Sequence, residues 1–285
     1  MSWRNEDHVW YNAIQSLANG VRSYERDERR LVGGTVDKLC VRLELNPWQP
    51  YFDYGDAFKT DRDFSFRQLR WYELKNRSVF GSPVEGRGQW AHVKPGKDGL
   101  TNSNYGWCVY SPENGDGVKS QFDFATDSLL ENGDSRQAMI FYSGPRMYVD
   151  WKADGMRDFT CTAYTHLFLR WDYPKDEAYL VYLVRQRSCD LFGGFFYDFP
   201  HHCEVYRRAF SRLAEKYPVK ETYGKIVYDV DTLHVYERDF EKLLKIHDSF
   251  EFTDTKRERL EKSIKENPSS TKYASPRRKL KLDKV

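Results

Sequence analysis

Two stretches of the sequence decide the fold, DGMRDFTCT at residues 154–162 and RQRSCDLFGGFFYD at residues 185–198. The first runs into residues 162–171 and the second continues residues 178–187, and both segments are rich in aromatic and β-branched residues. A polar turn around Pro174 separates the two segments. This pattern predicts a β-hairpin, with the quoted stretches at its open end.

Cys161, at the head of the first predicted strand, is a candidate nucleophile. A lone cysteine in an apolar strand is usually a packed core residue, and a reactive thiolate needs a cation close by. Arg187 stands at the end of the second strand, and a hairpin would bring it within reach of Cys161. Spacing alone leaves both interpretations of this cysteine open.

The flanking sequence predicts further elements around the hairpin. Apolar residues recur at helical spacing over residues 10–21, which predicts an amphipathic helix. Helices are also predicted at residues 66–74, 205–217 and 240–246, strands at residues 31–45, 139–142, 147–151 and 225–236, and a loop at residues 94–105. We expect one α+β domain over residues 1–250, with a central, mostly β sheet packed with helices, and a basic tail over residues 251–285.

Composition narrows the class of protein. The chain has 285 residues, of which 40% are hydrophobic and 16% aromatic, so it can form a sizeable core. No stretch reaches the roughly 18 apolar residues of a membrane span, and the first ten residues lack the apolar segment of a secretory signal, so we expect a cytoplasmic protein without a membrane partner. The five cysteines form no CxxC pair and the seven histidines show no ligand spacing, so we expect neither a disulfide framework nor a metal site.

The charge is unevenly distributed along the chain. The formal net charge is +2, but the segment from residue 256 onward carries 11 Lys or Arg and four Asp or Glu. This segment therefore has a charge of +7, which leaves about −5 for the rest. Such a tail can contact nucleic acid or a partner, or it can be a solvated segment, and we expect the second.

Six segments occur in the order and approximate spacing of the thymidylate synthase superfamily. They are RQLRWY (67–72), NSNYGW (102–107), DSR (134–136), DGMRDFTCT (154–162), RQRSCDLFGGFFYD (185–198) and LHVY (233–236). NSNYGW, and DGM followed by a cysteine–threonine pair, resemble the deoxycytidylate hydroxymethylases of T-even phages. The resemblance covers residues 60–245, and it implies a thymidylate synthase-like fold and a homodimer joined through the sheet.

The resemblance also implies a mechanism for Cys161. Its thiolate would add to carbon 6 of a pyrimidine nucleotide and make carbon 5 nucleophilic. Carbon 5 would then attack the one-carbon unit of the co-substrate 5,10-methylenetetrahydrofolate. Once the folate has left, water would give a hydroxymethyl group, whereas hydride would give a methyl group. Tyr105 matches a tyrosine that lies near the nucleophile in the family.

Several positions match the family's phosphate contacts. Arg187 and Ser188 match a phosphate-binding arginine and serine, and a guanidinium suits a phosphate dianion through bidentate bonds. Arg136 matches an arginine that the family contributes across the dimer interface to the partner's phosphate. A second arginine usually follows it, and in this chain that position is Gln137.

Other matches concern the sugar and the folate. His234 and Tyr236 match a pair that hydrogen-bonds the sugar hydroxyl. Asp190 matches an aspartate that contacts the folate, and the resemblance assigns Gly194 and Trp90 to the same co-substrate. Taken one at a time, these residues could equally serve packing or surface ion pairing.

Asp198 is the most informative position, because thymidylate synthases have an asparagine there that reads uracil. Uracil presents a ring N–H donor and a carbonyl acceptor, whereas cytosine presents a ring-nitrogen acceptor and an amino donor. A carboxylate can accept from the amino group and support protonation of the ring nitrogen, but it would face the uracil carbonyl with no donor between them. Asp198 therefore indicates dCMP as the substrate. The alternative is a turn residue before Pro200.

The chain departs from the family at several positions. Gln68 stands where the family has a glutamate that relays protons and places water, and a glutamine cannot titrate. Thr162 replaces the histidine of thymidylate synthases, as it does in the phage hydroxymethylases, and His166 stands where many relatives have glutamine. The C-terminal residues lack the apolar tail that closes thymidylate synthases over the folate, which favours hydration over hydride transfer.

These observations lead us to expect a one-carbon transferase that makes 5-hydroxymethyl-dCMP for modified phage DNA in the cytoplasm of the host. Two alternatives stay open. One is a dCMP 5-methyltransferase on the same scaffold, motivated by Gln68. The other is a catalytically weakened nucleotide-binding homologue, motivated by Gln68, Gln137 and the basic tail. CMP is a further candidate substrate, because His234 and Tyr236 do not by themselves distinguish it from dCMP.

Overall fold

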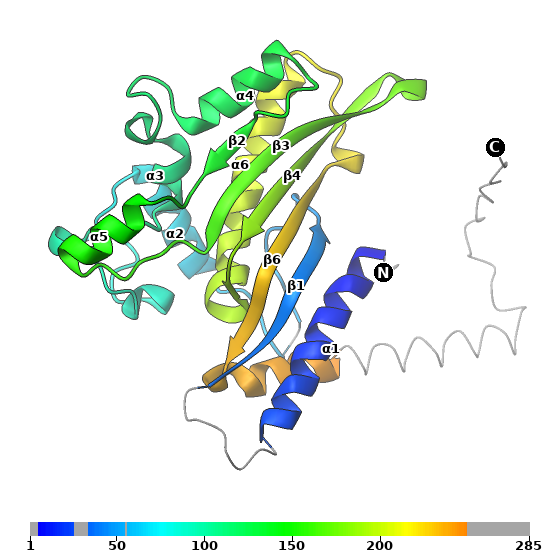
Figure 1. Ribbon diagram of the computed structural model, residues 1–285. Helices are drawn as coiled ribbons and strands as arrows, with labels where there is room; N and C mark the ends of the chain where they lie inside the picture. Colours follow the sequence, from blue (N-terminus) through cyan, green and yellow to red (C-terminus); the bar gives the residue numbers. More distant parts are fainter. Residues whose placement is uncertain (1–4, 26–33, 55, 250–285) are drawn as a thin grey trace, which may run out of the picture.

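The computed structural model describes residues 5–25, 34–54 and 56–249 (Figure 1). Its helices are α1 (Asn5–Glu25), α2 (Arg62–Leu74), α3 (Tyr105–Tyr110), α4 (Gln121–Glu131), α5 (Arg146–Asp154), α6 (Phe196–Ala214) and a last helix at residues 240–249. Its strands are β1 (Thr35–Leu45), β2 (Met139–Phe141), β3 (Thr162–Asp172), β4 (Glu177–Gln186), β5 (Cys189–Asp190) and β6 (Lys225–Tyr236). A π-helical turn, η5 (Leu191–Phe195), leads directly into α6.

The strands form one sheet in the order β1-β6-β4-β3-β2, with β5 paired to β6. β3 and β4 form the predicted antiparallel hairpin, in which Thr165 pairs with Val184. β4 and β6 run parallel, so the chain crosses between them through α6, which lies behind the sheet in Figure 1. β1 pairs antiparallel with β6, and α1 packs beside it. The expected α+β architecture is confirmed.

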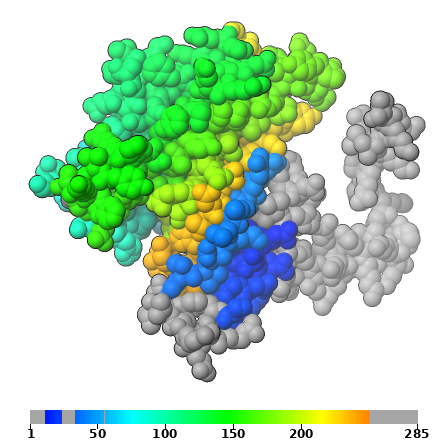
Figure 2. Space-filling view, in the orientation of Figure 1, coloured from blue at the N-terminus to red at the C-terminus, as the bar shows by residue number. Residues whose placement is uncertain are grey.

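The two faces of the sheet have different surroundings. In β4 the even-numbered side chains from Ala178 to Gln186 are buried, whereas the odd-numbered ones are only half-buried. The buried face shares one core with the α6 side chains Phe199, Val205 and Ala209. Figure 2 shows the other face, where β3 and β4 (green) and β6 (orange) reach the surface. We call this second face the open face.

The NSNYGW segment is held tightly against the end of α2. Asn104 caps α3 by accepting a hydrogen bond from Trp107 N at 2.8 Å, and its Nδ2 donates to Trp71 O at 3.2 Å. Gly106 faces the carbonyl oxygen of Tyr72, and a Cβ atom at this position would lie 1.9 Å from that oxygen. Glycine is therefore required here by the close approach of two helices rather than by an unusual backbone angle.

The structure corrects some predicted elements. Residues 147–151, predicted as a strand, lie in α5, which begins after Pro145 and ends at Gly155 with a left-handed φ of 69°. The apolar alternation does not reflect burial there, because Val149 is 63% exposed. α6 begins at Phe196 rather than at residue 205, and α4 has no counterpart among the predicted elements.

The remaining predicted elements agree with the structure to within a few residues. The described part of the predicted first strand coincides with β1, while residues 31–33 and the tail over residues 251–285 lie outside the described residues. Within the described part of the chain, no helix is long and apolar enough to cross a membrane.

Candidate active site

Cys161 lies in a bend immediately before β3, where the hairpin opens, and its side chain is half-buried. The hairpin brings Arg187 next to it, since Arg187 N donates to Cys161 O at 3.0 Å. The guanidinium is held by the two preceding carbonyls: Nε donates to Thr160 O at 3.1 Å and Nη2 donates to Phe159 O at 2.8 Å. The two residues that the sequence placed at the open end of a hairpin therefore lie together.

Asp198 is buried in the first turn of α6 and interacts electrostatically with Cys161. Burial raises the pKa of Asp198 to about 8, the nearby Asp190 carboxylate adds to this rise, and a hydrogen bond from Gln186 opposes it. Burial likewise raises the pKa of Cys161 to about 12; the Asp198 carboxylate adds to this effect and Arg187 counteracts it. A protonated Asp198 therefore removes a negative charge that disfavours the thiolate.

Tyr105 enters the site from α3. Its hydroxyl accepts a hydrogen bond from Thr162 N at 3.3 Å, so it contacts the residue that follows Cys161. Its ring is buried and stacks on Tyr72 with a centroid distance of 5.7 Å. Burial, followed by the Asp198 charge, raises the pKa of Tyr105 well above its ordinary value, so this hydroxyl stays protonated.

Gln68 is buried on α2, and its amide is engaged at both ends. Its Oε1 accepts from Gln89 Nε2 at 2.7 Å and from Trp90 Nε1 at 3.0 Å. Its Nε2 donates to Tyr197 O at 3.2 Å, directly before Asp198 in the chain. The amide thus ties Trp90 to the start of α6, which is a positioning role that requires no titration.

Asp190 lies in β5, paired in register with His234 of β6. One of its carboxylate oxygens accepts from Phe192 N at 3.1 Å, and the other lies 3.6 Å from the Arg238 guanidinium. A Cβ atom at Gly193 would come within 2.5 Å of Asp190 Oδ2, so a side chain there would displace the Asp190 carboxylate. Burial raises the pKa of Asp190, and hydrogen bonds from the backbone N–H groups of Gly193 and Phe192 oppose the rise.

His234 and Tyr236 are half-buried neighbours on the same side of β6, with ring centroids 5.2 Å apart in an edge-on arrangement. The Arg238 guanidinium lies over the Tyr236 ring at 4.5 Å. Gly194 follows Gly193 in η5, and Ser188 is half-buried next to Arg187. The predicted sugar, phosphate and folate residues therefore lie on β5, β6 and the turns adjoining them, except Trp90, which lies in a short 3-10 helix (Gly88–Ala91), and Arg136.

Comparison with known proteins shows the family to which the chain belongs. No family model matches the chain. It is 33% identical over 196 residues to the deoxycytidylate 5-hydroxymethyltransferase of Enterobacteria phage T6, covering 65% of this chain and 75% of that protein. The enzymes of the same name from phages T4 and T2 are each 32% identical over the same shares. The chain belongs to the deoxycytidylate 5-hydroxymethyltransferase family.

The fold is thymidylate synthase-like. The thermostable thymidylate synthase A from Bacillus subtilis superimposes with a TM-score of 0.59 at 19% identity, over 86% of this chain and 84% of that one. The resemblance to the hydroxymethyltransferases that the six sequence segments indicated is therefore confirmed.

One residue predicted for this hydroxymethyltransferase site lies elsewhere. Arg136 is exposed and lies before β2. Met139, three residues on, pairs with His166, which is five residues along β3 from Cys161. At about 3.3 Å per residue, Arg136 lies at least about 16 Å along the strand from its own Cys161.

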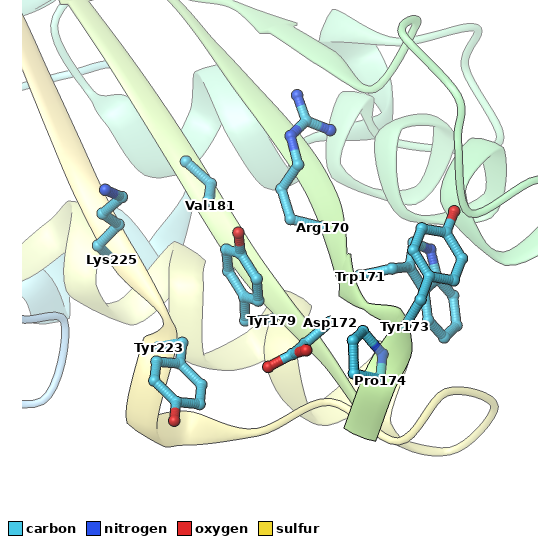
Figure 3. A pocket seen from close by; sticks show the side chains of 9 residues that line it. All are labelled: Arg170, Trp171, Asp172, Tyr173, Pro174, Tyr179, Val181, Tyr223 and Lys225. Carbon is cyan, nitrogen blue, oxygen red and sulfur yellow. The ribbon is translucent and has the colours of Figure 1, made fainter. Parts of the chain in front are cut away.

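The open face carries a hollow that is separate from the catalytic residues (Figure 3). It has a volume of about 630 Å³ and lies at the turn end of the hairpin. Its lining residues are Arg170, Trp171, Asp172, Tyr173, Pro174, Tyr179, Val181, Tyr223 and Lys225. Tyr179 and Val181 are open-face residues of β4, whereas Gln186 is on the buried face that leads to Asp198.

Sequence reasoning missed a set of buried polar residues behind the site, chiefly Gln186 and His202. The one signal for Gln186 is its place in β4, where it follows the alternating buried residues and puts an amide on an apolar face. His202 has no such signal in the sequence. The structure places His202 within 3.4 Å of Thr162 Oγ1.

Proposed function

We propose that this protein transfers the one-carbon unit of 5,10-methylenetetrahydrofolate to carbon 5 of dCMP and completes the reaction with water, giving 5-hydroxymethyl-dCMP. One observation carries the proposal: a buried carboxyl group, Asp198, interacts electrostatically with Cys161 in a chain that matches phage deoxycytidylate 5-hydroxymethyltransferases over three quarters of their length. Because those relatives are phage enzymes, we infer that the reaction serves phage DNA precursors in the host cytoplasm.

Asp198 reads the base in this proposal. With its pKa raised to about 8, the carboxyl is protonated at neutral pH. A neutral carboxyl donates a hydrogen bond to the cytosine ring nitrogen and accepts one from the amino group, so both of these groups have a hydrogen-bond partner. Proton transfer to the ring nitrogen makes carbon 6 more electrophilic as the Cys161 sulfur adds to it. Arg187 favours the thiolate that this step requires.

Arg187 and Ser188 hold the phosphate. The Arg187 Nε and one Nη2 hydrogen are committed to Thr160 O and Phe159 O, which leaves about three of the five guanidinium N–H donors for a phosphate. Because the committed bonds fix the plane of the guanidinium, the remaining donors are pre-oriented. His234 and Tyr236 contact the sugar hydroxyl from β6.

The residues expected on the folate side are compatible with a pteridine co-substrate. Asp190 offers a partly buried carboxylate acceptor beside two glycines, Gly193 and Gly194, which have no side chain to obstruct a flat ring. Trp90 is fixed by Gln68 and supplies a buried indole nearby. Methylenetetrahydrofolate supplies the one-carbon unit, and these residues bind and orient it.

Gln68 bears on the identity of the product. Its Oε1 is occupied by Gln89 and Trp90, so the amide fixes the site without exchanging protons. A second candidate function, methylation of dCMP, rests on this loss of a titratable group. We favour hydration, because the matched relatives carry the hydroxymethyltransferase name and Asp198 selects cytosine in either case.

The decisive experiment measures tritium release from dCMP labelled at carbon 5, with methylenetetrahydrofolate, and identifies the product by mass spectrometry. Release with a 5-hydroxymethyl product is expected, and Cys161→Ala should abolish it. A 5-methyl product would instead establish the second candidate. Release from dUMP alone would contradict the role of Asp198, and parallel assays with CMP test the requirement for deoxyribose.

We further propose that the enzyme works as a homodimer joined through the open face. Apolar side chains of β2, β3 and β4 remain partly exposed there, and Phe141 is 53% exposed. Arg136 precedes the edge strand β2 and is too far along the sheet to serve its own Cys161, so we assign it to the phosphate in the partner's site.

A further inference from the structure

Arg187 binds the backbone of a short loop, residues 158–161, which ends in Cys161 and which we call the nucleophile loop. The last three carbonyl oxygens of this loop all accept hydrogen bonds from Arg187. Cys161 O accepts from the backbone N–H at 3.0 Å, Thr160 O from Nε at 3.1 Å and Phe159 O from Nη2 at 2.8 Å. A shift of this loop would therefore move the nucleophile and the guanidinium together.

The other side of the nucleophile loop is held by its first residue, Asp158. One carboxyl oxygen, Oδ2, accepts from Asn102 N and Ser103 N, both at 2.7 Å, and the other, Oδ1, lies 2.5 Å from the Ser103 hydroxyl. The Asn102 side chain adds a fourth bond, from Nδ2 to Asp158 O at 3.0 Å. Asp158 and Asn102 are both buried, so these bonds are largely shielded from competing water.

The side-chain amide of Asn102 has only one favourable orientation. Arg77 donates from Nη2 to Asn102 Oδ1 at 2.7 Å and from Nε to Thr101 O at 2.9 Å. A guanidinium has donors and no acceptor, so the amide turns its oxygen toward Arg77 and its NH₂ group toward Asp158 O.

The contacts of the Asp158 carboxyl group do not depend on its protonation. Oδ2 accepts from the same two backbone N–H groups in either state. The Ser103 hydroxyl donates to Oδ1 when the carboxyl is ionised and accepts from it when the carboxyl is protonated. An asparagine side chain could make the same contacts, with its oxygen toward the two N–H groups and its NH₂ toward the hydroxyl. An alanine side chain could make none of them.

The NSNYGW segment also binds the far end of the nucleophile loop. The Tyr105 hydroxyl accepts from Thr162 N at 3.3 Å, directly after Cys161. Cys161 thus lies between two residues, Asp158 and Thr162, that are both hydrogen-bonded to residues 102–105.

We propose that Asp158 is a positioning residue for the reaction. Together with Asn102 it fixes the nucleophile loop against the NSNYGW segment, which orients the Arg187 guanidinium toward the phosphate and holds the Cys161 sulfur in place for attack on carbon 6. It acts through Arg187 and Cys161 rather than on the substrate. This inference rests on the proposed function, in which Arg187 binds the phosphate of dCMP.

The test measures the affinities of dCMP and deoxycytidine, by calorimetry without folate, for the wild type, Asp158→Ala and Asp158→Asn. In Asp158→Ala we expect dCMP to bind about tenfold more weakly or worse, because a misplaced guanidinium loses bonds to the phosphate. Deoxycytidine has no phosphate, so its affinity should change by less than about twofold. Asp158→Asn should bind dCMP within about threefold of the wild type, since it keeps the contacts.

Asp123→Ala is the matched control. Asp123 Oδ2 accepts from Ser120 N at 3.0 Å and from Ser120 Oγ at 2.6 Å, so Asp123 makes the same kinds of bond on α4, which carries none of the site residues. Both affinities should stay unchanged in this variant. The proposal would be overturned by an unchanged dCMP affinity in Asp158→Ala, by equal weakening of dCMP and deoxycytidine there, or by an equally large loss in Asp158→Asn.

If Asp158→Ala does not fold, Asn102→Ala provides a second route, because it removes the bond to Asp158 O. We expect the ratio of the dCMP affinity to the deoxycytidine affinity to fall in the same direction, by a smaller factor. An unchanged ratio would overturn the proposal.

A measurement without substrate separates this inference from the proposed function. Iodoacetamide labelling of Cys161, followed by peptide mass spectrometry and normalised to the exposed Cys40, should be at least about threefold faster in Asp158→Ala than in Asp158→Asn. Both variants lack the charge, and only the first releases the loop. Equal rates would overturn the inference. A wild-type protein that binds no dCMP, together with this difference in labelling, would refute the proposed function alone.

Discussion

Asp198 and Cys161 form an acid–thiol pair in which the proton on one group governs the reactivity of the other. Burial raises the pKa of Cys161, an ionised Asp198 raises it further, and the Arg187 guanidinium lowers it. In the free protein we therefore expect a thiol of low reactivity. Transfer of a proton from Asp198 to cytosine would couple nucleophilic attack to the presence of the correct base.

Replacement of Asp198 by asparagine should change the base preference. An amide that reads uracil donates to its carbonyl and accepts from its ring N–H, and it cannot transfer a proton to cytosine. We expect kcat/KM for dCMP to fall at least about a hundredfold in Asp198→Asn while dUMP turnover appears. Tritium release from both nucleotides measures this. Asp229→Asn, on the open face, should leave the preference unchanged, and an unaltered preference in Asp198→Asn would contradict the assignment.

The same carboxyl group should leave a signature in the pH dependence of stability. Burial raises its pKa from 3.8 to about 8, so the folded protein binds this proton more tightly than the unfolded chain does. Its stabilising contribution is complete below pH 3.8 and is lost as the pH rises through 8. Asp198→Asn stays neutral throughout. The free energy of unfolding of the variant, relative to that of the wild type, should therefore increase between pH 5 and 8.5 by up to a few kcal/mol, at about 1.4 kcal/mol per pKa unit. Urea unfolding at both pH values tests this, and a constant difference would count against it.

Gln68 gives a third prediction at this scale. A carboxylate in its place could accept from Gln89 and Trp90 but would face Tyr197 O without a donor. We expect Gln68→Glu to lower the free energy of unfolding by about 1–3 kcal/mol at pH 8, and by less at pH 4, where a protonated acid can donate. Urea titrations at these pH values measure the loss. Higher stability than wild type at pH 8 would show that Gln68 is not the positioning residue described here.

The sequence was sufficient to identify the site residues that lie in the six segments, because each segment is a short continuous stretch whose local geometry follows from its own residues. Cys161 and Arg187, for example, lie together because one hairpin connects them. Gln186 and His202 could not be assigned a role in advance. Their partners are on β3 and α6, and which side chains meet across a core depends on packing that no local pattern encodes.

Helices and strands show how local signals compete. Residues 147–151 alternate apolar side chains and resemble a strand, but Pro145 before them and Gly155 after them are helix boundary signals that outweigh the alternation. α4 has a capping box between Ser120 and Asp123, a signal that was present in the sequence but not used. The hairpin was predictable, because its strands are adjacent in sequence and each alternates in burial.

The contact between α2 and α3 gives a prediction at the scale of elements. A methyl group at Gly106 would collide with the carbonyl of Tyr72, a backbone atom that cannot move without shifting α2. We expect Gly106→Ala to cost at least about 3 kcal/mol and to lower the melting temperature by about 5–10 °C. Gly144→Ala is the control, since nothing lies within 4 Å of the added atom. Similar melting temperatures for both variants would mean that the two helices are not packed this closely.

Considered as a whole, the molecule has its catalytic residues at one end of the buried face of the sheet. Its partly apolar open face, the one seen in Figure 2, lies on the other side of the sheet. If two copies join through the open faces, each site takes Arg136 from its partner. Arg136→Ala and Cys161→Ala should each be nearly inactive alone. A mixture allowed to exchange subunits should recover about a quarter of wild-type activity, since half the dimers would be mixed with one complete site each. No recovery, in protein shown by ultracentrifugation to exchange, would refute the shared site.

The order of the strands could not be predicted from sequence patterns alone. β1 and β6 are separated by most of the described chain, and nothing in either strand specifies the other beyond a general tendency to pair. The expected thymidylate synthase-like fold came instead from the family resemblance. The pairing of β1 with β6 is thus the part of the fold that depends most on residues far apart in the sequence.

That pairing also affects how the protein is made. Thr35 pairs with Tyr236, so the two strands leave the ribosome roughly 10–40 seconds apart at about 5–20 residues per second. Throughout this interval Val41 and Leu43, which are buried in the finished sheet, have no neighbouring strand to cover them. The nascent chain must therefore shield an incomplete β1 with α1 or with a chaperone until β6 has been synthesised.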